Sequence, residues 1–152
     1  MRNNFDLKIR GLKFSFIASD RTMEEIITMA SLIEAEAGVA GYETKQWVSG
    51  VLWRRIEIGM LLQVDAVFSY INQEHISQVL FKHLEIESPY NTYKYPGLPP
   101  TPVSNPDLDS IRAALFPVDT GNLFYITGND GYFYYGRTLD EHNQNIQNHL
   151  RN

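Results

Sequence analysis

Met23-Glu24-Glu25-Ile26-Ile27-Thr28-Met29-Ala30-Ser31-Leu32-Ile33-Glu34-Ala35-Glu36-Ala37 is the stretch that decides how this sequence is read. At about 100° per residue, six of its apolar side chains fall on one arc of a helical wheel, which predicts an amphipathic helix. Thr22 and Glu25 have the spacing of a capping box at the start of this helix, and Gly38 supplies a stop at its end. The two ends therefore fix the register of the wheel.

Glu34 lies in the middle of the apolar arc, one turn after Ala30. Glu24, Glu25 and Glu36 lie off the arc and are expected to be solvated. Burial of a carboxyl group raises its pKa and favours the protonated form, which is the form that a general acid needs. The pattern therefore predicts Glu34 as a catalytic acid. The alternative is a structural glutamate that is paired with an arginine or lysine.

The composition limits the possible classes of protein. A chain of 152 residues with 43% hydrophobic residues is long enough for one domain with one core. A net charge of −5 without a basic stripe argues against nucleic acid as a partner. The sequence has no cysteine, and the spacing of its four histidines matches no metal motif, so no metal or other cofactor is expected. No apolar run reaches the roughly 18 residues of a membrane span.

Apolar periodicity and capping residues predict the other elements. Residues 1–21 are expected to form a lead-in with a short strand or irregular structure, and 60–71 fit either a strand or a short helix. The predicted helices cover 44–57, 75–84, 106–115 (capped by Asn105) and 138–150 (with a capping box of Thr138 and Glu141). Two strands, 123–127 and 132–135, flank a hairpin turn at Gly128-Asn129-Asp130-Gly131. The sequence therefore predicts an α+β fold, with several helices packed against a small antiparallel hairpin in a single domain.

The segment 88–106 is rich in proline and tyrosine. Proline removes backbone donors and fixes φ, so the segment cannot be a regular helix or a central strand. A long aromatic loop in a small domain usually shapes a site, although tyrosines that cap the core would explain it equally well.

Five segments together resemble the YceG-like endolytic murein transglycosylases. They are Met29-Ala30-Ser31-Leu32-Ile33-Glu34-Ala35-Glu36-Ala37-Gly38, the stretch from Gly50 to Asp65, Ser88-Pro89-Tyr90-Asn91-Thr92-Tyr93, Gly97-Leu98-Pro99-Pro100 with Asn105-Pro106, and Thr138 with His142 and Asn143. The resemblance covers the catalytic domain of that family and assigns its catalytic acid to Glu34.

The resemblance implies cleavage of the β-1,4 bond between N-acetylmuramic acid and N-acetylglucosamine in peptidoglycan. The muramyl 6-hydroxyl would attack its own C1 and close a 1,6-anhydro ring, so one carboxyl group would serve as acid and then as base. Two alternatives stay open. Asp65 could be a second catalytic carboxylate, which would make the enzyme a glycoside hydrolase, or the chain could be a glycan-binding module without catalysis.

The resemblance also implies a set of substrate-binding residues. Tyrosine faces could stack on sugar rings, Gln63 and Asp65 would line the site or brace a loop, and His142 is expected to be structural rather than catalytic. The implied set is Gln63, Asp65, Ser88, Tyr90, Asn91, Thr92, Tyr93, Asn105, His142 and Asn143.

Residues 22–152 are expected to form the catalytic domain, without the membrane anchor and the small LysM-like domain of the family. The implied partners are peptidoglycan glycan strands and the peptidoglycan synthesis machinery. The implied location is the outer face of the bacterial cytoplasmic membrane.

Overall fold

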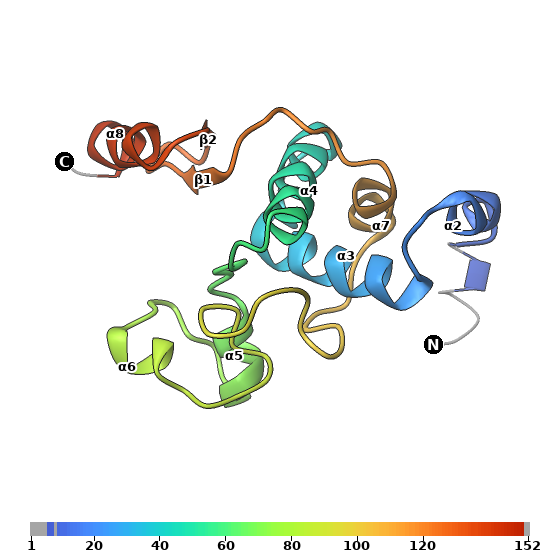
Figure 1. Cartoon of the computed structure of the whole chain (residues 1–152), viewed down its shortest axis with the longest axis horizontal. Helices are drawn as coiled ribbons and strands as arrows, with labels where there is room; N and C mark the ends of the chain where they lie inside the picture. Colours follow the sequence, from blue (N-terminus) through green and yellow to red (C-terminus); the bar gives the residue numbers. More distant parts are fainter. Residues whose placement is uncertain (1–5, 8, 151–152) are drawn as a thin grey trace.

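Three helices form the centre of the protein in this computed structural model, which describes residues 6–7 and 9–150. Helix α3 (Met23–Ala37) packs against α4 (Tyr42–Glu57) and α7 (Leu108–Leu115), as Figure 1 shows. The predicted helix 23–37 is confirmed, and the predicted helix 44–57 begins two residues earlier, at Tyr42.

The start of α3 has the predicted capping box. The backbone N–H of Glu25 donates to Oγ1 of Thr22 at 3.1 Å, and the backbone N–H of Thr22 donates to Oε2 of Glu25 at 2.7 Å. Burial extends around α3 well beyond the apolar arc, because Thr28, Ser31 and Leu32 are buried as well. Helix α3 is therefore a central helix, covered on more sides than its amphipathic pattern suggests.

A segment of short helices and loops follows α4. Helix α5 (Val67–Asn72) settles the ambiguous stretch 60–71 as an extended lead into one short helix. The predicted helix 75–84 is wrong except for its last turn, α6 (Phe81–Leu84). The chain leaves α5 in the left-handed conformation at Gln73 (φ 54°), and the backbone N–H of Ile76 donates to Oγ of Ser69 instead of joining a helix.

The C-terminal part confirms the hairpin. Strands β1 (Phe124–Thr127) and β2 (Phe133–Gly136) are antiparallel, with Tyr125 opposite Tyr135, and α8 (Leu139–His149) packs against both. Thr138 caps α8 as predicted, but the carboxylate of Glu141 accepts from the backbone N–H of Arg137, so the capping box is only half formed. Several helices with one two-stranded sheet confirm the predicted α+β class.

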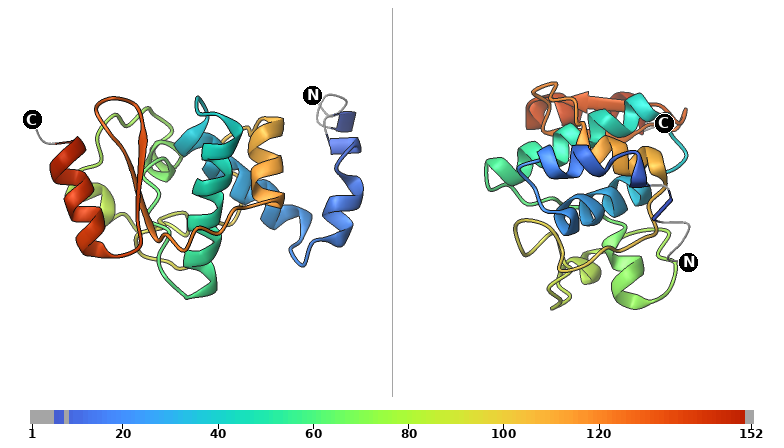
Figure 2. Two further views of the ribbon diagram at one scale, coloured as in Figure 1. Left: turned by 90° about the horizontal axis from the view of Figure 1, so that it is seen from above. Right: turned by 90° about the vertical axis from the view of Figure 1, so that its right-hand side faces the viewer.

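The lead-in segment differs from its prediction, because residues 13–18 form helix α2 (Lys13–Ala18) rather than a strand or irregular chain. Helix α7 also starts later than predicted, since its N-cap is Asp107 and not Asn105. Helices α2 and α8 lie at opposite ends of the molecule (Figure 2). Among the described residues, no helix is both long enough and apolar enough to cross a bilayer.

Candidate active-site cleft

Glu36 stands at the last turn of α3, where the hairpin meets the end of this helix. The phenol of Tyr125, on β1, donates a hydrogen bond to Oε2 of Glu36 at 2.8 Å. Burial, together with the neighbouring carboxylate of Glu36, raises the pKa of the Tyr125 phenol, so the phenol keeps its proton and acts as a donor. The C-terminal hairpin therefore holds one oxygen of Glu36 in place.

Burial raises the pKa of Glu36 above its ordinary value, because the ionised carboxylate loses solvation. The hydrogen bond from Tyr125 opposes this shift, and the negative charge of Asp65 adds to it. The net effect is a raised pKa of Glu36. Glu36 is therefore a carboxyl group that holds its proton to a higher pH than a solvated glutamate.

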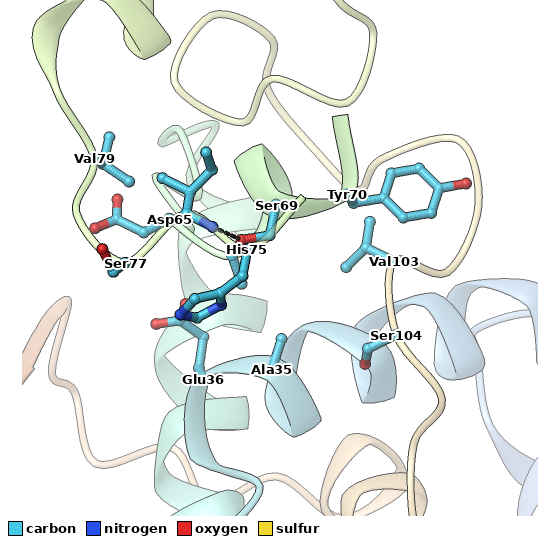
Figure 3. Close-up of a pocket in the computed structure, with 12 residues that line it drawn as sticks. Ala35, Glu36, Asp65, Ser69, Tyr70, His75, Ser77, Val79, Val103 and Ser104 are labelled. Carbon is cyan, nitrogen blue, oxygen red and sulfur yellow. Dashed lines mark hydrogen bonds between the residues drawn. The ribbon is translucent and has the colours of Figure 1, made fainter. Parts of the chain in front are cut away.

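Two cavities meet at Glu36 and Asp65, which line both of them. The first cavity has a volume of about 540 Å³ and lies between the end of α3, α5 and the loop that carries His75. Figure 3 shows Glu36 and Asp65 among its walls, together with Ser69 and Tyr70. The second cavity, of about 440 Å³, lies between the end of α3 and the hairpin with α8. The two cavities together form a cleft with Glu36 at its middle.

The tyrosine-rich loop braces one wall of this cleft. Thr92 is buried; its Oγ1 accepts from the backbone N–H of Val64 at 3.0 Å, and its carbonyl accepts from the backbone N–H of Gln63 at 3.1 Å. Asn91 is fully buried and donates from Nδ2 to the carbonyls of Leu84 and Ile86. Asn91 and Thr92 therefore hold the loop and do not face the cleft.

Tyr93 is the loop residue that reaches the second cavity. Its phenol donates a hydrogen bond to Oδ1 of Asp65, and its ring packs on Phe68 with the ring centroids 5.7 Å apart. Burial and the contact with Asp65 raise the pKa of Tyr93. Tyr93 thereby fixes the orientation of the Asp65 carboxylate beside Glu36.

Gln63 and His142 also line the second cavity. Gln63 has a positive φ of 51°, which is uncommon for a residue other than glycine and is often found at functional sites. The ring of His142 stacks on Phe124, with the ring centroids 5.0 Å apart, and its pKa is lowered by burial and by the charge of Arg55. His142 therefore forms a neutral aromatic part of the cavity wall near neutral pH.

The remaining predicted residues lie elsewhere. Ser88 and Tyr90 line a third hollow, which adjoins the first cavity at Ser69 and Tyr70. Asn105 and Asn143 are exposed and line neither cavity of the cleft.

Glu34 lies on the other side of α3, against the N-terminus of α7. Its Oε2 accepts from the backbone N–H of Asp107 at 3.0 Å and from the hydroxyl of Ser110 at 2.8 Å. The buried ammonium of Lys45 lies 3.7 Å from the same oxygen and 2.8 Å from Oδ2 of Asp107. Burial of Asp107 is outweighed by its bonds from Lys45 and Ser110, which lower its pKa to about 2. Glu34 thus belongs to a charged cluster that anchors α7, and it lines neither cavity.

Sequence reasoning placed Glu36 on the solvated face and did not select Tyr125 or Arg55. Arg55 is buried in the wall of the second cavity, where Nε donates to the carbonyl of Leu123 at 2.7 Å and Nη1 donates to that of Leu62 at 2.6 Å. A signal for Glu36 did exist, because Met29 and Leu32 precede it on the same face of the helix. No group of three or more histidine, aspartate or glutamate side chains in the described part of the chain is arranged to hold a metal ion.

Comparisons with known proteins identify the family of the chain. A sequence model of the YceG-like family matches residues 1–148. An endolytic murein transglycosylase of Bacillus subtilis (strain 168) is 40% identical over 123 residues, which make up 81% of this chain and 34% of that protein. An endolytic murein transglycosylase of Streptococcus pneumoniae (strain ATCC BAA-255 / R6) is 31% identical over 147 residues, with 92% of this chain and 26% of that protein covered.

The crystal structure of a YceG-like protein from Listeria monocytogenes has the same fold. It matches with a TM-score of 0.87 and 34% sequence identity, over 93% of this chain and 46% of that chain. The chain thus spans about a third or less of the length of the two curated relatives. The extent of the family match and the identity to these relatives lead to one conclusion: the chain belongs to the YceG-like family.

Proposed function

We propose that this chain carries the catalytic site of a lytic murein transglycosylase, and that Glu36, rather than Glu34, is its general acid and base. One observation carries the proposal: a carboxyl group with a raised pKa lies where two cavities meet. An enzyme that cuts within a polymer needs room for the strand on both sides of the reacting bond. The cleft offers that room on both sides of Glu36. The names of the two curated relatives point to the same reaction class.

The proposed reaction uses one carboxyl group twice. The proton of Glu36 goes to the oxygen of the β-1,4 bond between N-acetylmuramic acid and N-acetylglucosamine as the bond from muramyl C1 to this oxygen breaks. The muramyl 6-hydroxyl oxygen then bonds to C1, and its proton goes to Glu36, which regains its starting form. No water is consumed, and the product end is a 1,6-anhydro ring.

The surroundings of the two glutamates favour Glu36 for this role. A general acid must hold its proton and present it to the substrate. Oε2 of Glu34 is occupied by two hydrogen-bond donors and lies near the Lys45 ammonium, and Glu34 lines neither cavity, so it is not placed to reach a bound strand. Burial of Glu36 beside the charge of Asp65 favours the protonated form. We therefore assign a structural role to Glu34 and the role of general acid and base to Glu36.

A two-carboxylate hydrolase is the second candidate, because Asp65 lines both cavities together with Glu36. In that reaction Asp65 would activate a water molecule or attack C1. The hydrogen bond from Tyr93 to Oδ1 instead gives Asp65 a positioning role in our proposal. The chemical nature of the product ends distinguishes the two reactions.

The experiment is digestion of purified peptidoglycan, with the products identified by mass spectrometry. Anhydro-muramyl ends are expected from the unchanged protein, whereas reducing ends would indicate a hydrolase, and binding without cleavage would indicate a glycan-binding module. Glu36→Gln is expected to abolish product formation while keeping the thermal transition of the parent. Glu34→Gln is the matched control and is expected to retain product formation. Retained cleavage in Glu36→Gln would overturn the assignment.

The biological setting follows from this substrate. We propose peptidoglycan glycan strands as the partner and residues 22–152 as the catalytic domain. Action on this polymer places the domain on the outer side of the cytoplasmic membrane. Association with the peptidoglycan synthesis machinery is a further part of the proposal, and a pull-down with the full-length protein would test it.

A further inference from the structure

A third hollow extends the cleft away from the hairpin. It has a volume of about 450 Å³, and it shares Ser69 and Tyr70 with the first cavity. In Figure 3 the ring of Tyr70 points away from Glu36. The three cavities therefore follow one another along a single surface. The third hollow is lined by Ser69, Tyr70, Ile71, Gln73, Ser88 and Tyr90.

Two tyrosine rings form the aromatic part of this hollow. Tyr70 and Tyr90 pack with their centroids 4.9 Å apart and their planes tilted by 42°. Tyr70 is 40% exposed, so much of its surface is free to contact a ligand. A hydrogen bond of 2.7 Å between the hydroxyls of Tyr90 and Thr101 fixes the second ring. The exposed ring of Tyr70, packed on the half-buried ring of Tyr90, suits the apolar C–H face of a pyranose.

Gln73 places a polar side chain at the rim. It ends α5 in the left-handed conformation, with φ 54°, and its side chain is exposed. Among the described residues, Gln63 and Gln73 are the non-glycine residues with positive φ, and each lines a cavity of this surface. Such conformations cost free energy and concentrate at functional sites. An amide at this position can hydrogen-bond the N-acetyl and hydroxyl groups of a hexosamine.

We propose that Tyr70, Tyr90 and Gln73 form a distal subsite that binds an N-acetylhexosaminyl residue of the same glycan strand that lies across Glu36. This inference rests on the proposed function and specifies how that site selects its substrate. Only a strand long enough to reach from Glu36 past Tyr70 fills the subsite. The protein therefore prefers long strands to short fragments.

Binding to a protein that does not cleave tests the subsite without relying on catalysis. In the Glu36→Gln background, Tyr70→Ala and Tyr90→Ala are expected to weaken the binding of long, uncross-linked glycan strands about fivefold, which is the size expected for the loss of an aromatic contact. Binding of a muramyl tetrasaccharide, measured by calorimetry in parallel, is expected to stay at the parent value. Tyr132→Ala is the matched control, because Tyr132 is 70% exposed and lies on the hairpin, outside the three cavities.

Two more variants separate the ring from its hydrogen bond. Tyr90→Phe and Thr101→Val both remove the Tyr90–Thr101 bond while the ring remains, so both are expected to keep long-strand binding. The proposal is overturned if Tyr70→Ala and Tyr90→Ala leave long-strand binding unchanged, or if they weaken tetrasaccharide binding equally. The proposed function can fail separately from the subsite. In that case the parent forms no anhydro-muramyl ends, whereas the Glu36→Gln variant still binds long strands more tightly than the tetrasaccharide.

Discussion

Tyr125 and Glu36 are 89 positions apart in the chain, and a hydrogen bond of 2.8 Å joins the phenol of one to the carboxylate of the other. This bond links the C-terminal hairpin to the end of the central helix. The hairpin also supplies part of the wall of the second cavity, through Phe124 and Thr127. Folding of the hairpin therefore completes the cleft and positions the candidate acid in one step.

Tyr125→Phe is expected to move the alkaline limb of the pH–activity profile to higher pH. The hydrogen bond stabilises the ionised form of Glu36, so its loss raises the pKa of Glu36 further above the ordinary value. A general acid works in its protonated form, so activity then persists to higher pH. The loss of positioning is expected to lower kcat about tenfold at the optimum. Release of anhydro-muropeptides, followed across pH, measures both effects, and a limb that moves to lower pH would contradict the prediction.

Asp65→Asn is expected to move the alkaline limb of the pH–activity profile to lower pH. The negative charge of Asp65 raises the pKa of Glu36, so a neutral side chain of the same size lowers this pKa, and activity falls at a lower pH than in the parent. The same pH series measures the shift. A rate that collapses uniformly at every pH, without a displaced limb, would instead identify Asp65 as a catalytic carboxylate of a hydrolase.

The fold was largely predictable from local signals, because its caps and turns are encoded by neighbouring residues. The Thr22–Glu25 capping box and the glycine-rich hairpin turn require only a few adjacent positions. The segment 75–84 could not be predicted in this way. Its apolar residues resemble a helix, but the backbone N–H of Ile76 donates to Oγ of Ser69, and the chain continues as a loop.

The helical wheel selects Glu34, and not the Glu36 that we propose, because an amphipathic pattern assumes one buried face. Helix α3 packs against both α4 and α7, and Met29 and Leu32 of its second apolar row are as fully buried as Ala30 and Ile33 of the first. Glu36 continues this second row into the cleft. Glu34 continues the first row toward α7, where Lys45 neutralises it. Only the tertiary structure shows that Glu34, and not Glu36, lies beside the ammonium of Lys45.

Glu34→Gln is expected to lower stability by about 1–3 kcal/mol while peptidoglycan cleavage continues. The amide loses the negative charge beside the buried ammonium of Lys45, and its neutral oxygen is a weaker acceptor for the backbone N–H of Asp107 and the hydroxyl of Ser110. Urea unfolding measures the loss in the free energy of unfolding. Glu24→Gln, at an exposed position of the same helix, is the control and is expected to unfold close to the parent. Loss of cleavage in folded Glu34→Gln would restore Glu34 as the acid.

Arg55→Lys is expected to lower the free energy of unfolding by about 2–4 kcal/mol and to reduce cleavage. The guanidinium of Arg55 is buried and bonds the carbonyls of Leu62 and Leu123, which directly precede Gln63 and Phe124 in the lining of the second cavity. A lysine ammonium lacks the planar fork that reaches both carbonyls, so one of them loses its donor, and the hairpin separates from the wall that carries Gln63. The neighbouring Arg54→Lys is a matched control, because Arg54 is 39% exposed and pairs with Asp119 at the surface, where such pairs contribute little. If both variants unfold at the same temperature and cleave at the same rate, Arg55 does not hold the cleft together.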